Sequence, residues 1–406
     1  MRTFAKSNRM LNVSYEVKGR VLEEAARMEA NGDKVLKLNI GNPAPFGFEA
    51  PKEVMDAVRD GLFASQGYSD TRGVLEAREA IAAYCVEKGI RGVTLDNIFL
   101  GNGLSELIII CMQALLNDGD EILIPAPDYP VWTAAANLAG GNAVHYICDE
   151  SSDWVPDIED IRRKITSKTK AIVIVNPNNP TGAVYSRDVL EKIAALAREH
   201  ELMIFSDEIY DRLIMDGIEH TSIASIAEDV CCVTLNGLSK SHLICGFRLG
   251  WICLSGRTDL ASGFIEGVKV LASMRLCSNV PAQHAVVAAL NHREETKQMF
   301  APGGRVYKQR EAICQGLAKI DGITFVRPQG GFYVFPKIDA KRFNIKDDER
   351  FVLDFLHAEK VLLLHGTGFS WPDPDHFRIV FMPLPEELTE CAEKLGRFLS
   401  CYHQEN

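Results

Sequence analysis

The chain has 406 residues, of which 47% are hydrophobic and 24% are charged. These values are typical of a soluble globular protein with roughly two or three domains, and they exclude a small disulfide-stapled module, a fibrous protein and a disordered chain. The 44 basic and 55 acidic residues give a net charge of −11, which repels nucleic acid and anionic membrane surfaces. We therefore expect small-molecule partners, with no nucleic acid and no membrane.

The sequence also bears on where the protein works. Its longest apolar run, Leu107–Leu116, is far shorter than the ~20 residues that span a bilayer. The 11 cysteines lie mostly in apolar segments without the even spacing of a disulfide framework, which favours a reducing compartment. The N-terminus carries Arg2, Lys6 and Arg9 but no apolar stretch of a secretory signal. We expect a cytoplasmic protein, with a short organellar transit peptide as the alternative.

The first part of the chain predicts an α/β domain. A helical pattern covers residues 19–31, and an apolar strand covers residues 35–40. Between about residues 97 and 256, short apolar segments alternate with helical patterns; the predicted strands are 97–101, 121–125, 143–148, 171–176, 202–207, 230–235 and 249–254. Continuous apolar strands separated by helices are typical of a mostly parallel, here seven-stranded, sheet that is covered on both faces. Functional residues should then lie beyond the C-terminal ends of these strands.

After residue 300 the pattern changes to that of a smaller α+β domain. It predicts a helix over 305–320, a hairpin-like pair over 325–336, a helix over 349–359, a strand over 377–381 and a final helix from Glu386. We divide the chain into an N-terminal segment (1–45) that joins the small domain, a large domain (46–300) and a small domain (301–406). The two domains are expected to share a cleft.

Several common catalytic motifs are absent from the sequence. It has no HExxH pair, no CxxC pair, no GxxxxGK[ST] phosphate loop and no GxSxG turn, so we predict neither a metal site nor serine hydrolysis. Residues 101–106 (GNGLSE) only partly match a dinucleotide fingerprint, because Glu106 stands at the third glycine position. Gly103 and Ser105 still lie between a strand and a helix whose free N–H groups suit a phosphate, although a plain βα turn is the alternative.

Polar side chains follow two further predicted strands. The loop NPNNPTG, at 176–182, holds Asn178 and Asn179 as fixed amide donors, unless it is merely a rigid loop. Asp207 ends an apolar strand, and Tyr210 follows on the same side of a turn. A carboxylate in that position must be paired or functional, because burying it alone costs several kcal/mol; the alternative is that it caps a following helix.

Three cations complete the set. Lys240 follows the strand 230–235, where a lysine can act as a nucleophile toward an aldehyde, although most lysines after strands are solvated. Arg248 suits a bidentate phosphate contact, and Arg378, inside an apolar strand, requires a carboxylate from the protein or a ligand. Together these residues predict a binding site for pyridoxal 5'-phosphate in an α/β cleft. The site would offer a lysine for a Schiff base, an acid for the pyridinium nitrogen, donors for the phosphate and an arginine for a substrate carboxylate.

In their order and spacing, NPNNPTG, SDEIY and SK followed by GFR resemble the fold-type I aminotransferases, and the resemblance runs over nearly the whole chain. The segments LNIGNPAPFGF, PAPDYPVWTAA, ASMRLCSNVPAQ and FPKIDAKRFNI are similar to the bacterial glutamate–pyruvate (alanine) aminotransferases. This resemblance implies a pyridoxal-phosphate enzyme of alanine biosynthesis that moves an amino group between alanine and 2-oxoglutarate by a ping-pong mechanism. It also implies a homodimer whose active sites lie at the subunit interface.

The resemblance assigns roles around the cofactor's ring. Lys240 is the catalytic residue, which forms the internal aldimine and then serves as the base for the proton shift. Asp207 keeps the pyridine nitrogen protonated, and Tyr129 stacks on the ring. Asn179 and Tyr210 hold the ring's phenolate oxygen.

It also assigns the phosphate and substrate contacts. The phosphate is bound by Gly103, Leu104, Ser105 and Arg248, and by Tyr68 of the neighbouring subunit. Arg378 binds the substrate α-carboxylate, with Asn179 and the backbone of Gly41 beside it. Arg275 is a candidate for the distal carboxylate of glutamate in the partner's site, or else an interface arginine.

Two positions depart from the family pattern. Gly237 stands where a phosphate-binding serine is common, so either Ser239 replaces that contact or the cradle has one donor fewer. His242, two residues after the lysine, fits a packing role better than a catalytic one.

Two alternatives to an alanine aminotransferase are consistent with parts of the sequence. The same cofactor supports an aminotransferase for aromatic or branched-chain amino acids, or a β-lyase, because the outcome depends on substrate geometry that no motif records. A ligand-sensing regulator on an aminotransferase-like body would need an additional DNA-binding domain, for which the chain has neither spare length nor basic charge.

Overall fold

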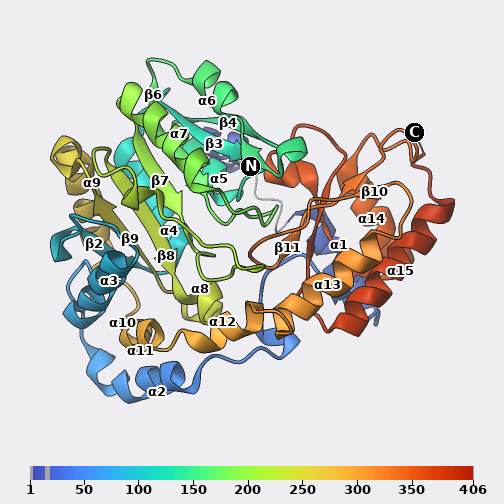
Figure 1. Cartoon of the computed structure of the whole chain (residues 1–406), viewed down its shortest axis with the longest axis horizontal. Coiled ribbons are helices and arrows are strands. Elements are labelled where there is room, and N and C mark those ends of the chain that lie inside the picture. Colours follow the sequence, from blue (N-terminus) through green and yellow to red (C-terminus); the bar gives the residue numbers. More distant parts are fainter. Residues whose placement is uncertain (1–2, 14–18, 406) are drawn as a thin grey trace.

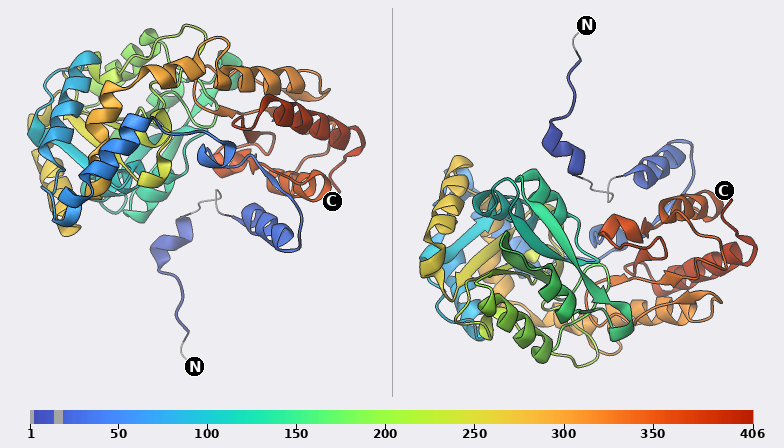
Figure 2. Two further views of the ribbon diagram at one scale, coloured as in Figure 1. Left: turned by 90° about the horizontal axis from the view of Figure 1, so that it is seen from below. Right: turned by 90° about the horizontal axis from the view of Figure 1, so that it is seen from above.

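The computed structural model describes residues 3–13 and 19–405, arranged as a large and a smaller body side by side (Figure 1). Arg2, one of the N-terminal basic residues, lies outside these ranges. The first described residues, with the short helix η1 (Asn8–Asn12), project from the body (Figure 2). None of the helices in the described ranges combines the length and the apolar character needed to cross a bilayer.

The large body is built on an eight-stranded sheet with the order β2-β9-β8-β7-β6-β3-β4-β5. The strands are β2 (Ile98–Gly101), β3 (Glu121–Ala126), β4 (Asn142–Asp149), β5 (Val155–Pro156), β6 (Thr169–Val175), β7 (Met203–Asp207), β8 (Cys232–Gly237) and β9 (Gly250–Ser255). The strands from β8 to β4 are parallel, whereas β9 is antiparallel to both its neighbours and β5 to β4. The seven predicted strands are confirmed, and the two-residue β5 is too short for an apolar pattern to reveal.

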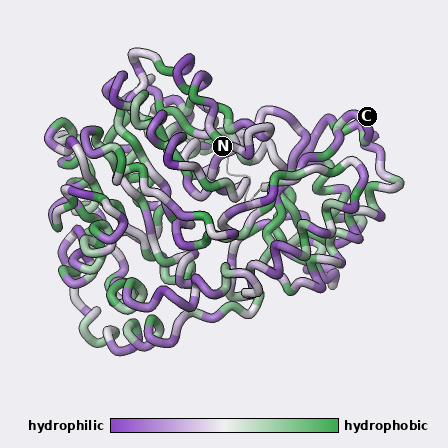
Figure 3. Tube along the Cα trace, in the orientation of Figure 1, coloured by the Kyte–Doolittle hydropathy of each residue, from purple (hydrophilic) through white to green (hydrophobic). Residues whose placement is uncertain are grey.

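Helices cover both faces of this sheet, as the continuous apolar strands predict. One face packs on α4 (Leu104–Leu115), α5 (Val131–Leu138) and α9 (Ser262–Met274), and the other on α3 (Leu75–Glu87), α7 (Arg187–Glu199) and α11 (Ala285–Asn291). Successive residues of β6 alternate between the two cores: Val173 belongs to the first, and Ile172 and Ile174 to the second. The hydropathy tube shows this apolar interior (Figure 3).

The small body consists of helices packed on short strands. Its elements are α1 (Arg20–Ala30), β1 (Leu36–Lys37), α13 (Arg305–Leu317), β10 (Ile323–Thr324), β11 (Tyr333–Val334), β12 (Lys337–Ile338), α14 (Asp348–Glu359), β13 (Val361–Leu362), β14 (Leu364–His365), β15 (Phe377–Val380) and α15 (Pro385–Cys401). β1 pairs in parallel with β13, so the chain near residue 36 lies in this body. The remaining α-helices are α2 (Lys52–Gly61), α6 (Ile158–Lys164), α8 (Leu238–Ser241), α10 (Val280–Gln283) and α12 (Glu294–Phe300).

The hairpin-like pair predicted over 325–336 is found only just outside these bounds, where β10 pairs antiparallel with β12. Within the bounds there is no hairpin, because β11 pairs with β15. The reason is that the intervening residues take their backbone partners from the large body: Gln329 and Gly330 both donate to the carbonyl of Gly182, and Gly331 donates to that of Leu213. These bonds fix the two bodies against each other.

Candidate active site

Ten of the predicted site residues line one cleft beyond the C-terminal ends of β6, β7 and β8. They are Gly41, Leu104, Ser105, Tyr129, Asn179, Asp207, Tyr210, Lys240, Arg248 and Arg378. The cleft encloses about 810 Å³, part of it open to solvent. Parallel strands end at the same edge of a sheet, so residues far apart in sequence meet there.

Asp207 ends β7 at the floor of the cleft and is only 2% exposed. Its carboxylate accepts the backbone N–H of Ile209 at 3.2 Å and the indole N–H of Trp132 at 3.4 Å. Burial raises the pKa of this carboxyl to about 6, because these two neutral donors do not compensate for the lost water. The chain turns through residues 208–212 without forming a helix, so Asp207 is not a helix cap here.

Tyr210 lies on the same side of this turn as Asp207. Its hydroxyl is 2.8 Å from the hydroxyl of Tyr333, and the two rings meet edge to face. Tyr333 comes from β11 of the small body, is buried and lines the cleft. Sequence reasoning missed this residue; the signal that pointed to it was the pair Gly330-Gly331 just before it, which marks a close approach of two backbones.

Lys240 lies in the one-turn helix α8 that follows β8. Its ammonium donates a 2.6 Å hydrogen bond to the carbonyl of Gly41. A Cβ at position 41 would lie 2.4 Å from the Tyr333 hydroxyl and 3.4 Å from Lys240 Nζ, so only glycine lets the backbone come this close. The amine therefore lies where the N-terminal segment and the two bodies meet.

One corner of the cleft presents hydrogen-bond donors. Gly103 has a φ of +84° at the start of α4, and a Cβ there would lie 2.3 Å from the Arg248 guanidinium. The first N–H groups of α4 have no acceptor within the helix, so together with Arg248 they can bind an anion. Glu106 accepts the N–H of Asn102 at 2.7 Å and its amide at 2.9 Å, and so closes the turn at the position of the missing third glycine.

Arg378 reaches the cleft from β15. It donates to the side-chain oxygen of Asn179 at 2.8 Å and to the carbonyl of Asn39, and its guanidinium lies 4.6 Å from the ring centres of Tyr333 and Phe369. In the loop 176–182 the two asparagines differ: Asn178 holds the loop through Thr181, whereas Asn179 faces the cleft.

Other predicted residues lie outside the cleft. Tyr68 is 80% exposed on the surface. Arg275 donates to the carbonyl of Leu100 at 2.6 Å and lies 3.5 Å from Glu106. His242 is buried between Ser241 and the carbonyl of His292, and burial lowers its pKa to about 4.

The structure gives a physical reason for the departure at position 237. A Cβ on Gly237 would lie 2.7 Å from the carbonyl oxygen of Leu249 and 3.1 Å from Leu104, so a serine does not fit there. Ser239 lines the cleft beside Lys240 instead. Cys245 also lines it and contacts Asn42.

The residues of the cleft fit pyridoxal phosphate in charge and shape. The Lys240 amine matches an aldehyde, and Arg248 with the start of α4 matches a phosphate. The buried Asp207 carboxylate has only neutral hydrogen-bond donors among the described residues, and a protonated ring nitrogen supplies the missing positive charge. Asn179 and Tyr210 present polar groups between these ends.

Comparisons with known proteins agree with this geometry. Residues 33–395 match the family model described as aminotransferase class I and II. The chain is 55% identical over 404 residues to the glutamate-pyruvate aminotransferase AlaA of Escherichia coli K12, covering 100% of both proteins. It is 50% identical over 404 residues to the alanine aminotransferase of Mycobacterium bovis, covering 99% of this chain and 94% of that relative.

A solved structure of an aminotransferase from Escherichia coli has a TM-score of 0.98 to this chain at 55% identity, and the match covers 100% of each. The two-body fold, the converging side chains and the family match agree over almost the entire chain. The chain belongs to the class I and II aminotransferases.

Proposed function

We propose that this chain is an alanine aminotransferase that uses pyridoxal 5'-phosphate to move an amino group between L-alanine and 2-oxoglutarate, yielding pyruvate and L-glutamate by a ping-pong mechanism. The observation that carries the proposal is the convergence of Lys240, Asp207 and Arg378 in one cleft of a class I and II aminotransferase. Full-length identity of 55% to a glutamate-pyruvate aminotransferase supports the choice of substrates.

In this proposal, two residues of the cleft act on protons. When bound, pyridoxal phosphate withdraws electrons from the substrate carbon that carries the amino group. Lys240 Nζ would act as the base that takes the proton from that carbon and then as the acid that delivers it on the other side of the amino nitrogen, which completes a 1,3-proton shift. Asp207 holds a proton on the ring nitrogen, because a buried carboxylate favours a positive partner.

The remaining residues of the cleft bind and orient. Asn179 and Tyr210 hold the ring's hydroxyl oxygen, and Tyr129 stacks on the ring. The phosphate contacts come from Gly103, Leu104, Ser105 and Arg248, with Ser239 in place of a side chain at position 237. The donors at the start of α4 and the close approach of Arg248 to Gly103 support this assignment.

Substrate binding centres on Arg378, with Gly41 and Asn179 beside it. The guanidinium is held between two aromatic rings, which orients its donors toward a carboxylate. Arg275 remains either a group for the distal carboxylate of glutamate in the partner's site or an interface arginine. Its bond to Leu100 holds it against its own subunit.

We also propose a cytoplasmic homodimer whose subunits share their active sites, with Tyr68 reaching the neighbouring cleft. Exposed apolar side chains support a contact surface, since Phe63, Tyr68 and Met274 are 86%, 80% and 75% exposed. Residues 69–72 lie beside residues 269 and 273 of α9, which brings these groups to one region. We keep the division into 1–45, 46–300 and 301–406, which the pairing of β1 with β13 supports.

A coupled assay tests the function. Purified protein with pyridoxal phosphate, L-alanine and 2-oxoglutarate should form pyruvate and glutamate in equal amounts. Release of ammonia would instead indicate a β-lyase. A larger kcat/KM for aromatic or branched-chain amino acids than for alanine would indicate the other alternative, and either result contradicts the proposal.

Replacing Arg378 tests the carboxylate contact. Arg378→Lys keeps the charge but loses the bidentate geometry, so the KM values of alanine and glutamate should rise together by about 10- to 100-fold, the range expected when about 1.5–3 kcal/mol of charged hydrogen bonding is lost. Arg305→Lys is the matched control, because Arg305 also stacks on a ring, that of Phe48, and donates to backbone carbonyls, but outside the cleft. An unchanged KM for alanine in Arg378→Lys would remove this residue from the role.

The buried carboxylate predicts a pH-dependent stability of the cofactor-free protein. The pKa of Asp207 is raised from 3.8 to about 6 in the folded state, so folding loses stability as the pH rises from about 4 to about 6 and stays lowered above that. Asp207→Asn should therefore stabilise the cofactor-free protein by about 3 kcal/mol at pH 8 and by almost nothing near pH 4. Thermal unfolding at several pH values measures this; an equal gain at both ends of the range would refute it. With cofactor bound, the same variant should lose turnover.

A further inference from the structure

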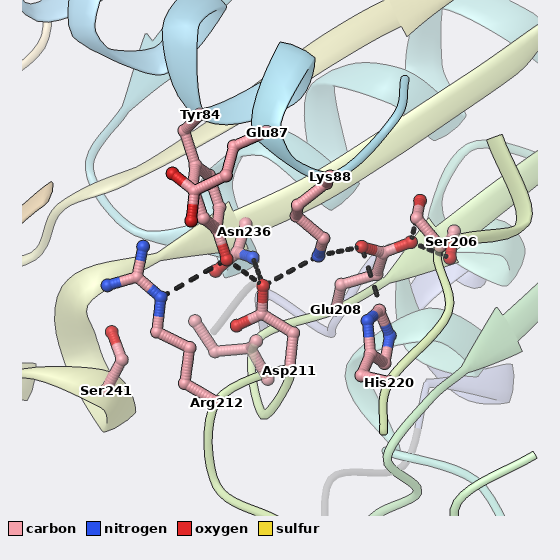
Figure 4. Close-up of polar contacts among 12 residues, drawn as sticks. Tyr84, Glu87, Lys88, Ser206, Glu208, Asp211, Arg212, His220, Asn236 and Ser241 are labelled. Atoms are coloured by element: carbon pink, nitrogen blue, oxygen red, sulfur yellow. Dashed lines mark hydrogen bonds and ion pairs between the residues drawn. The ribbon is translucent and has the colours of Figure 1, made fainter. Parts of the chain in front are cut away.

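A cluster of buried charged side chains lies between the end of α3 and the turn that follows β7 (Figure 4). It joins Lys88, just after α3, to Glu208 and Asp211 in the turn that follows β7, and to Tyr84 and Asn236; we name these five residues the Lys88 cluster. Both carboxylates are buried, and the Lys88 side chain is 12% exposed. None of the five lines the cleft.

The ammonium of Lys88 bridges the two carboxylates. Nζ donates to Glu208 Oε2 at 2.5 Å and to Asp211 Oδ2 at 2.7 Å. The same Asp211 oxygen accepts from the Tyr84 hydroxyl and, at 2.8 Å, from the Asn236 amide. The other oxygen of Glu208 accepts from two serine hydroxyls, those of Ser206 at 2.9 Å and Ser222 at 2.6 Å.

These contacts keep the bridge charged inside the protein. Burial alone would lower the pKa of Lys88, but the charges of Asp211 and Glu208 outweigh it and hold this pKa above its ordinary value. Burial likewise would raise the pKa of Asp211, but the charges of Lys88 and Arg212 hold it below its ordinary value. Removing one partner of such a buried set leaves an uncompensated charge, which the surrounding chain must move to accommodate.

The turn that carries these carboxylates also carries the groups that face the cofactor. Asp207 and Tyr210 line the cleft, whereas Glu208 and Asp211 face Lys88, so the two sets alternate along one short turn. This turn has no helix to fix it; Asp211 N–H bonds to the carbonyl of Glu208 at 3.0 Å. Backbone bonds from the Glu208 N–H to the carbonyl of Leu235 at 2.9 Å and from the Leu213 N–H to the carbonyl of Tyr210 at 2.8 Å also hold this turn, and the side-chain bridge adds to them an anchor at the end of α3.

The cluster also reaches the strand that precedes Lys240. Asn236, which donates to Asp211, accepts the N–H of Gly237 at 2.7 Å through its side-chain oxygen. Gly237 ends β8, and Lys240 follows in α8. One network thus connects the segment with Asp207 and Tyr210 to the segment with Lys240.

We propose that Lys88 is a positioning residue for the cofactor: its ammonium holds Glu208 and Asp211 together and thereby fixes Asp207 and Tyr210 relative to Lys240. Lys88 touches neither cofactor nor substrate in this arrangement. The inference rests on the proposed contacts of Asp207 and Tyr210 with the cofactor's ring.

The test compares Lys88→Met with Lys164→Met by titrating pyridoxal phosphate into the cofactor-free proteins. Lys164 is a matched control, because it also ends a helix and donates to a buried carboxylate, that of Asp160, at 2.7 Å, but it lies in α6 away from the turn. Lys88→Met should raise the cofactor's dissociation constant about tenfold or more, because the carboxylates left without their cation move the turn that carries Asp207 and Tyr210. It should also shift the pH midpoint of the bound cofactor's visible absorption, whereas Lys164→Met should change neither value.

Kinetics separate positioning from general damage. In Lys88→Met, kcat should fall while the KM for alanine stays within about twofold, because Arg378 contacts none of the Lys88 cluster. Should that variant not fold, Lys88→Met with Asp211→Asn removes the bridge while an amide replaces the buried charge, and the same rise in the dissociation constant is expected.

The outcomes distinguish the two proposals. Unchanged cofactor affinity and absorption midpoint in the Lys88 variants, or an equal loss in Lys164→Met, overturns the positioning role alone. An unaltered protein that binds no pyridoxal phosphate overturns the proposed function together with this inference.

Discussion

The cleft depends on one constraint: a carboxylate is buried at the end of an apolar strand, and the part of the chain that the structure describes offers it only neutral donors. Burial holds the pKa of Asp207 well above its ordinary value, so at neutral pH this carboxylate destabilises the folded state of the cofactor-free protein. A ligand that brings a positive charge to this carboxylate removes the penalty. Binding and catalysis therefore draw on the same feature that destabilises the cofactor-free protein.

The second requirement is a fixed relation between two bodies. Asp207 and Lys240 belong to the large body, whereas Arg378 and Tyr333 come from the small body. The bodies are joined by the backbone bonds at Gly182 and by the 2.9 Å ion pair between Lys337 and Glu150. Beside that pair, Trp154 of the large body packs on Phe335 and Trp371. These contacts fix the position of Arg378, which binds the carboxylate in our proposal, relative to the amine of Lys240.

Much of the large body could be predicted from the sequence, because its strands are apolar throughout and their C-terminal ends must meet at one edge. Asn179 and Lys240 follow such strands and Asp207 ends one, so their positions in the sequence already indicate that they lie close together. The small body was less predictable: residues 325–336 form no hairpin, because backbone partners from Gly182 and Leu213 lie far away in sequence. Apolar patterns carry no information on such partners.

The limits of sequence reasoning are similar within the site. Tyr333 was missed because a tyrosine in an apolar segment looks like a core residue, and only the fold brings its hydroxyl to Tyr210. Lys88 was missed because a lysine at the end of a helix is ordinarily solvated, and its two carboxylates lie 120 and 123 residues further along the chain. The role of each residue depends on contacts with residues far away in the sequence, and no local pattern records such contacts.

The most direct measurement is the site of covalent attachment of the cofactor. Protein incubated with pyridoxal phosphate, reduced with borohydride and digested should carry the cofactor's mass on the peptide that contains Lys240, and Lys240→Ala should carry none while keeping its circular dichroism. A protein that remains colourless with added pyridoxal phosphate, or that carries the label equally in Lys240→Ala, would contradict the assignment of this amine.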